Sequence, residues 1–133
     1  MQVFMLQKEV IERMVAAPAT KAYGRLSVML QYRYEMTHLF DVPPHAFVPA
    51  PKVTSAVVRM LPRKPEQLLA KDEAHLSKLV ALAFSQRRKM LRNTLAEMVT
   101  QEQLIACDIA PTARAEEVSV AKFVQLSNFV LMQ

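Results

Sequence analysis

The stretch from Asp41 to Val58 contains four prolines within nine residues, at positions 43, 44, 49 and 51, and Phe47 lies between the two proline pairs. Proline fixes φ, has no N–H donor and forces the preceding residue into an extended conformation. The stretch therefore predicts a stiff loop that holds the Phe47 ring where solvent can reach it. The β-branched run from Val53 to about Leu61 predicts that this loop leads into a strand.

Phe47, taken alone, is compatible with two roles. Such a ring most often packs beneath its own loop. The alternative is a stacking surface for an unpaired or flipped base, worth about 1–3 kcal/mol per base. No Ser-His, Cys-His or paired-carboxylate arrangement accompanies the ring in the sequence. Chemistry at this loop would therefore have to come from a cofactor or from another part of an enzyme.

The N-terminal residues have the pattern of a β-α-β arrangement. Gln2–Gln7 is a nearly continuous apolar run, which predicts a strand buried on both faces in a parallel sheet. Lys8–Ala17 has helical spacing and ends at Pro18, and Tyr34–Val42 predicts a second strand. The two strands that flank the proline loop should form an antiparallel pair. Because the first strand is already fully apolar, we expect the rest of its sheet to lie upstream of Met1.

The C-terminal half has the pattern of a small helical domain. The Pro-Arg-Lys-Pro run at residues 62–65 predicts a domain boundary, so that residues 1–62 and 63–133 form separate units. Asp72, Thr100 and Ser119 each precede a helical pattern and predict N-caps. The expected buried stripes contain Leu76, Leu79, Val80, Ala83 and Phe84, then Met90, Leu91, Leu95 and Met98, then Leu104, Ile105 and Ile109, and finally Val120, Phe123, Val124, Ser127 and Leu131. The fold class is α+β.

Composition excludes several classes of protein. Gly24 is the one glycine, so this chain has no glycine-rich loop of the kind that binds nucleotides or S-adenosylmethionine. A lone Cys107 and three dispersed histidines exclude a disulfide framework and a zinc-ligand spacing, which fits a reducing cytoplasm. There is no 18-residue apolar run and no signal-peptide pattern. The net charge of +5 permits a polyanionic partner.

The densest basic cluster is Arg87, Arg88 and Lys89, and Arg92 follows. Three adjacent charges are as typical of a solvated helix face as of a binding site. The functional interpretation is a phosphate clamp, in which each cation releases counterions and positions the protein on a nucleic acid without reading bases. The cluster interrupts an otherwise apolar stripe, so we expect it at a helix junction on the surface of the helical domain.

Five blocks of sequence, in order, resemble the bacterial rRNA adenine N6,N6-dimethyltransferases that modify the small ribosomal subunit. They are MLQKEV (5–10), AYGRLSV (22–28), VPPHAFVPAPKVTSAVV (42–58), FSQRRKMLRNTL (84–95) and ARAEEVSVAKFVQLSNF (113–129). The resemblance covers only the later half of such an enzyme. It implies that residues 1–62 are the last β-α-β part of a Rossmann-like methyltransferase sheet and that residues 63–133 are a helical rRNA-binding domain.

The resemblance also implies roles for individual residues. Phe47 would stack on the target adenine, and Arg13, Arg87, Arg88, Lys89 and Arg114 would contact the rRNA of an immature 30S particle. The S-adenosylmethionine domain and the Asn-Leu-Pro-Tyr motif of the family are not in this sequence. We therefore expect no cofactor and no metal bound to this chain, and no activity from it alone.

Two other functions remain open from the sequence. A macrolide-resistance methyltransferase acting on 23S rRNA would share the aromatic loop and the helical domain. A non-enzymatic RNA-binding module would bind small-subunit RNA without S-adenosylmethionine. A further expectation concerns association: Val3, Phe4 and Leu6 of the first strand, and Val10, Ile11 and Met14 of the first helix, should lack the sheet they pack against. Such surfaces favour a dimer or segment exchange through the N-terminal strand and helix.

Overall fold

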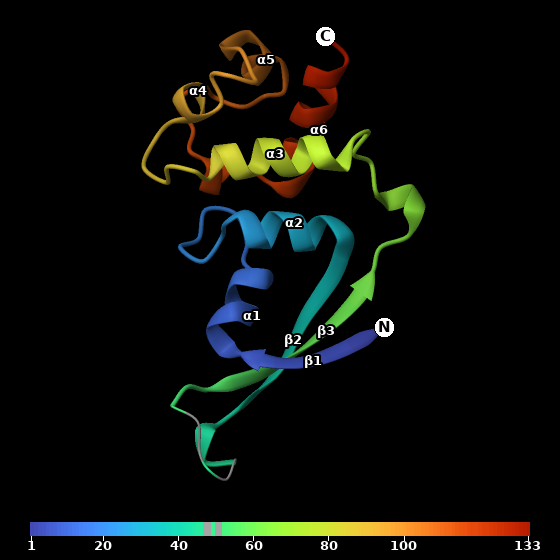
Figure 1. Ribbon diagram of the computed structural model, residues 1–133, viewed down its shortest axis with the longest axis vertical. Helices are drawn as coiled ribbons and strands as arrows, with labels where there is room; N and C mark the ends of the chain where they lie inside the picture. The colour runs from blue at the N-terminus through green and yellow to red at the C-terminus, as the bar shows by residue number, and fades with distance from the viewer. Residues whose placement is uncertain (47–48, 50–51) are drawn as a thin grey trace.

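A small antiparallel sheet lies at one end of the molecule and helices lie at the other (Figure 1). The computed structural model describes residues 1–46, 49 and 52–133. The strands are β1 (Gln2–Gln7), β2 (Tyr34–Val42) and β3 (Ser55–Pro62), in the order β1-β3-β2. Both β1 and β2 run antiparallel to β3, so they are parallel to each other. The prediction of an antiparallel pair around the proline loop is confirmed.

The exposure of Val3, Phe4 and Leu6 agrees with the expectation that they lack part of their sheet in this chain, so burial of β1 on both faces of a parallel sheet stays a prediction. Among the described residues β1 pairs with β3 alone, from Gln2 opposite Met60 to Gln7 opposite Ser55, and the pairing is antiparallel. All six of its residues are exposed. An apolar run shows what a strand is able to bury, whereas the neighbouring strands determine what it does bury.

The helix that follows β1 covers one face of the sheet. This helix, α1 (Lys8–Met14), buries Ile11 and Met14 against Ala56, Val58 and Met60 of β3. The expectation that Ile11 and Met14 would lack a sheet to pack against is therefore wrong. Their partners come from a strand more than 40 residues further along the chain, which local pattern does not reveal.

The second core lies among the helices α2 (Arg25–Arg33), α3 (Glu73–Ala83), α4 (Leu91–Thr94), α5 (Gln101–Ala106) and α6 (Val120–Leu131). The predicted stripes are largely confirmed, since Leu76, Leu79, Val80, Ala83, Leu91, Leu95, Leu104, Phe123 and Ser127 are all buried. The burial predicted for two of the residues is wrong, because Ile105 is 63% exposed and Leu131 is 41% exposed. The predicted N-caps are confirmed, because Asp72, Thr100 and Ser119 accept hydrogen bonds from the N–H groups of His75, Gln103 and Lys122.

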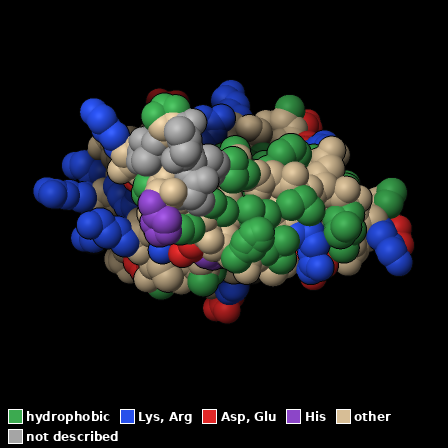
Figure 2. Space-filling model, turned by 90° about the horizontal axis from the view of Figure 1, so that it is seen from below, with side chains coloured by type: hydrophobic (Ala, Val, Ile, Leu, Met, Phe, Trp, Pro, Cys, Tyr) green, Lys and Arg blue, Asp and Glu red, His purple; other side chains and the backbone are tan. Residues whose placement is uncertain are grey.

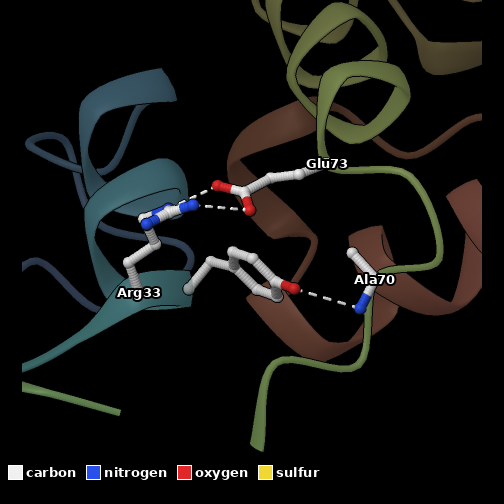
Figure 3. Close-up of polar contacts among 4 residues, drawn as sticks. Arg33, Ala70 and Glu73 are labelled. Carbon is white, nitrogen blue, oxygen red and sulfur yellow. Dashed lines mark hydrogen bonds and ion pairs between the residues drawn. The ribbon is translucent and has the colours of Figure 1, made fainter. Parts of the chain in front are cut away.

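Helix α2 connects the sheet to the helical core. At its C-terminal end the Arg33 guanidinium forms a bidentate ion pair with Glu73 at the start of α3, with one N–O distance of 2.8 Å (Figure 3). The Tyr32 hydroxyl accepts a hydrogen bond from the Ala70 N–H at 3.1 Å. Tyr32 and Val28 belong to the helical core although they precede residue 62. The division at residues 62 and 63 stays a prediction, and the structure shows a packed junction around it.

Candidate nucleic-acid interface

A groove of about 770 Å³ lies between α1, the loop before α2 and the loop after α3. Its basic lining residues are Arg13, Lys21, Arg25 and Arg87, and its acidic ones are Glu9 and Glu12. Arg13 is paired with Glu9, with an N–O distance of 2.9 Å. The groove therefore has an excess of positive charge along an open surface, which suits a phosphate backbone.

A cluster of three aromatic rings packs beneath the groove. The ring of Phe84, which lines it, packs edge-on against Tyr23 at 6.1 Å and at a tilt against Phe123 at 5.9 Å. Tyr23 is fully buried and donates its hydroxyl to the carbonyl oxygen of Val118 at 2.7 Å. Burial raises the pKa of the Tyr23 phenol far above its ordinary value. The loop before α2 is thus anchored in the helical core.

Ser27 anchors the same loop on the side of the sheet. It is fully buried in the first turn of α2, where its hydroxyl donates to the carbonyl oxygen of Arg13 and accepts from the N–H of Gly24 at 3.1 Å. These bonds join the end of α1 to the start of α2. The backbone that carries Arg13 and Arg25 is therefore held in a defined position.

Arg87 is held by the groove wall itself. Its guanidinium donates to the carbonyl oxygens of Lys21 and Tyr23, the latter at 3.2 Å. These partners lie 66 and 64 residues away in the sequence. Arg87, which is predicted to contact RNA, therefore also links the loop after α3 to the loop before α2.

Arg88 and Lys89 lie in the exposed turn between α3 and α4, which confirms the expected helix junction. Within the described residues, neither side chain has a hydrogen-bonding or ion-pair partner. Arg114 is exposed next to the 3₁₀ turn η3 (Ala115–Glu117).

Backbone bonds bring Arg114 towards the other cations. The N–H of Leu91 donates to the carbonyl oxygen of Ala113 at 2.8 Å, and the N–H of Ala19 donates to that of Glu116 at 2.6 Å. The segment that carries Arg114 therefore lies against both loops of the groove. In Figure 2 several Lys and Arg side chains gather at the left of the molecule, and others lie at the right and along the top. Sequence reasoning missed Lys21 and Arg25, since neither belongs to a dense basic cluster.

Phe47 lies outside the described residues, so its stacking role stays a prediction. The structure does describe the two ends of its loop. Lys8 joins them: its N–H donates to the Thr54 carbonyl oxygen at 2.9 Å, and its ammonium lies 3.0 Å from the Asp41 carboxylate. The hydrogen bond from the Lys8 ammonium, together with a weaker contribution from His38, holds the pKa of the Asp41 carboxyl group below its usual value.

The remaining surface is less informative about function. A smaller, mainly apolar cleft of about 320 Å³ lies between Gln31, Arg63, Leu69 and Val124, and none of the predicted site residues lines it. Among residues 1–46, 49 and 52–133 there is no cluster of His, Cys, Asp and Glu suited to a metal ion. In the same part of the chain, every helix is too short or too polar to cross a membrane.

The sequence model of the ribosomal RNA adenine dimethylase family matches residues 1–131. The chain belongs to that family, which confirms the resemblance. Proteins named ribosomal RNA small subunit methyltransferase A are similar to it: that of Aromatoleum aromaticum is 59% identical over 127 residues, covering 96% of this chain and 48% of that protein. The one of Bordetella petrii is 59% identical over 130 residues, covering 98% and 50%. The chain spans about half the length of the curated relatives it matches.

Solved structures agree on the fold. A dimethyladenosine transferase from Plasmodium falciparum matches 93% of this chain and 54% of its own, with a TM-score of 0.79 and 24% identity. A 23S rRNA methyltransferase matches 96% and 53%, with a TM-score of 0.66 and 23% identity. At these identities the likeness concerns the fold alone, and it covers about half of each of the two structures.

Proposed function

We propose that this chain forms part of an enzyme that dimethylates adenine N6 in small-subunit rRNA during ribosome assembly in the cytoplasm, with S-adenosylmethionine as the methyl donor. Family membership and the names of the relatives support the reaction class. The observation that carries the role of this chain is the basic groove. It is lined by both Arg13 and Arg87, which lie far apart in the sequence and are each expected to contact rRNA. Its proposed partner is the rRNA of the immature 30S particle.

The groove does not fit S-adenosylmethionine. The methyl donor carries a positive sulfonium, and the groove lining has more Lys and Arg side chains than its two acidic residues, Glu9 and Glu12, so its excess positive charge would repel the sulfonium. Gly24 has an extended backbone there and belongs to no glycine-rich loop. We therefore place the cofactor site outside this chain and expect the chain alone to bind RNA without methylating it.

The contribution of this chain is binding and orientation. Arg88, Lys89 and Arg114, which project from exposed segments, would neutralise phosphates and fix the register of the RNA. Phe47 would stack on the flipped adenine and hold it in line with the methyl group. Since N6 is a weak nucleophile, such positioning can supply much of the acceleration.

Arg87 has a different part in this proposal. Its guanidinium is already hydrogen-bonded to the carbonyl oxygens of Lys21 and Tyr23. We assign to it the positioning of the groove walls, and to Arg88 and Lys89 the contacts with phosphate. The two assignments predict different salt dependences, because only a cation that neutralises a phosphate contributes to the slope of log Kd against log salt.

RNA binding by the 133-residue chain tests the proposal. Fluorescence anisotropy with a labelled small-subunit rRNA fragment should show binding that weakens with salt. Arg88→Ala and Lys89→Ala should each reduce the salt slope by about 0.7–0.9. Arg87→Ala should weaken binding with little change in slope, and Arg87→Lys should not restore it, because an ammonium cannot span both carbonyls in the same geometry.

The controls address specificity and the rival functions. Lys71→Ala removes an equal charge near the C-terminal end of α6, where Lys71 contacts Met132, and should leave binding unchanged. Tighter binding to a large-subunit rRNA fragment would favour the macrolide-resistance function instead. Tight binding of S-adenosylmethionine to this chain in calorimetry would overturn the placement of the cofactor site. Absence of any salt-dependent RNA binding would overturn the role of the groove.

A further inference from the structure

Gly24 is the single glycine among the 133 residues, and the fold itself does not require it. Its backbone is extended, with φ −158° and ψ −164°, a conformation that residues with side chains also adopt. A Cβ atom at this position would have open space around it, because no described atom beyond the neighbouring chain lies within 4 Å. A side chain at position 24 would therefore fit the free protein without strain.

Helix capping makes a glycine at this position less expected still. Gly24 is the N-cap residue of α2, where it has no side chain to accept a hydrogen bond from the helix. The N-caps of α3, α5 and α6 are Asp72, Thr100 and Ser119, and each accepts such a bond. Because Ser and Asp stabilise helix N-termini more than glycine does, the stability of the fold alone favours one of them at position 24.

The open space beside Gly24 belongs to the basic groove. The groove volume of about 770 Å³ lies within the range of ligand-binding sites. Its lining includes the apolar residues Ala22, Leu26 and Phe84 as well as the cations described above. Leu26 is 42% exposed in the first turn of α2. The groove therefore offers apolar contacts in addition to positive charge.

The backbone around Gly24 is held in place on both sides. Tyr23 is anchored through its hydroxyl to Val118, and the Gly24 N–H donates to the Ser27 hydroxyl at 3.1 Å. Figure 1 shows the loop before α2 and the loop after α3 on the same side of the molecule. Among residues 1–46, 49 and 52–133, strand β1 contributes nothing to the groove lining. The space over Gly24 is thus formed by α1 and these two loops.

We propose that an unpaired nucleotide of the RNA lies over Gly24, with its base against Leu26 and Phe84. Its phosphates face Lys21 and Arg25 in the same groove. Glycine allows a ligand to approach the backbone closely, which accounts for a glycine that neither the backbone angles nor the packing require. The inference rests on the RNA-binding function proposed above and makes Gly24 a determinant of which RNA is bound.

The apolar part of the groove favours an unpaired nucleotide over a duplex. Base faces in a duplex are covered by stacking, and a protein meets mainly its phosphates and hydroxyl groups. Cations alone would suffice for such a partner. The base of an unpaired nucleotide is free to pack against apolar and aromatic side chains. Leu26 and Phe84 can contribute to binding only in this second case.

Thermal denaturation and fluorescence anisotropy with a labelled small-subunit rRNA fragment test the role of Gly24. Gly24→Ser should keep or raise the melting temperature and weaken RNA binding by about 5-fold or more, which corresponds to the loss of one packed base. The slope of log Kd against log salt should stay unchanged, because every cation is retained. Ala74→Ser, exposed at the opposite end of α3 from Phe84, should change none of these quantities.

The outcomes separate this inference from the function on which it rests. Salt-dependent RNA binding by the parent chain with equal affinity in Gly24→Ser would overturn the inference and leave the proposed function standing. A lower melting temperature for Gly24→Ser would also overturn the inference, because the fold would then require the glycine. A parent chain that binds no RNA would overturn both.

A second measurement tests the base itself in a Phe47→Ala chain, which lacks the other ring proposed to stack on a base. A hairpin RNA with a one-nucleotide bulge should bind about 5-fold or more tightly than the same hairpin with an abasic ribose in the bulge. Adding Gly24→Ser or Leu26→Ala should reduce this preference. Equal binding of the two hairpins by the Phe47→Ala chain would show that the groove holds phosphates alone and would overturn the inference.

Discussion

The helical end of this molecule closes its core, whereas the sheet end leaves much of its apolar surface exposed. Leu79 and Leu126 have no exposed surface, and helices from several parts of the sequence surround them. In β1, by contrast, Phe4 and Met5 are 41% and 53% exposed in a strand with a single neighbouring strand among the described residues. The helical end buries most of its apolar side chains, whereas the sheet end leaves several of them exposed.

This difference affects how each end can function. The closed helical core gives the basic loops a rigid support, through Tyr23, Phe84 and Phe123. The open sheet offers surfaces that gain stability on association. The RNA binding proposed above uses the helical end and its junction with α1.

The largest expected effect compares the two cores directly. Leu79→Ala in the helical core should lower the free energy of unfolding by about 3–5 kcal/mol, because many helices hold the cavity open. Ile11→Ala, at a site that is equally buried, should cost about 2–3 kcal/mol, since one helix over a small sheet can collapse more readily. Urea denaturation followed by circular dichroism measures both. A greater loss for Ile11→Ala would contradict the comparison.

A smaller effect is expected at Tyr23, which ties the loop before α2 to the helical core. Tyr23→Phe leaves the buried carbonyl oxygen of Val118 without its donor and should cost about 1–3 kcal/mol. Burial raises the pKa of this phenol, so the folded state favours the protonated form. The corresponding stability is fully present below about pH 10 and is lost as the pH rises further.

Denaturation at pH 8 and at pH 10.5–11 separates these two contributions. The parent should lose stability over this interval, and Tyr23→Phe should lose less. Tyr34→Phe, at the sheet end of α2, removes a hydroxyl that has no contact with Val118 and serves as the matched control. Equal alkaline loss in the parent and in Tyr23→Phe would show that Tyr23 does not govern the response.

Features with local signals were predictable from the sequence. Each N-cap was identified from one residue and the helical pattern behind it, and Asp72, Thr100 and Ser119 all accept the expected hydrogen bonds. The α3 stripe was found from its spacing, because a period of 3.6 residues requires no knowledge of the partner. The helix junction at Arg88 and Lys89 followed from the break in that stripe.

Features set by distant partners were not predictable. The burial of β1 depended on its neighbouring strands, and the sequence pattern of Gln2–Gln7 does not specify them. The two carbonyl oxygens that hold Arg87 are more than 60 residues away and have no side-chain signature. Lys21 and Arg25 enter the groove only through the packing of their loop. Among the basic residues of the candidate interface, Arg13 and Arg87 were therefore predictable from the sequence, whereas Lys21, Arg25 and the shape of the groove were not.

The smallest expected effect concerns the ion pair that joins the two ends of the molecule. Arg33 hydrogen-bonds to Glu73 and thereby lowers the pKa of that carboxyl group. Both side chains are partly exposed, by 52% and 37%, so solvent screens the pair. Glu73→Gln should shift the melting temperature at pH 7 by less than about 4 °C.

The pH dependence of this shift identifies its origin. A carboxyl group with a lowered pKa stabilises the fold above its ordinary pKa, near 4.5, and loses that contribution as the pH falls through the folded value. The difference between the parent and Glu73→Gln should therefore shrink towards pH 3. A large, pH-independent loss would mean that Glu73 matters through packing, and that the two ends are coupled more tightly than their separate cores indicate.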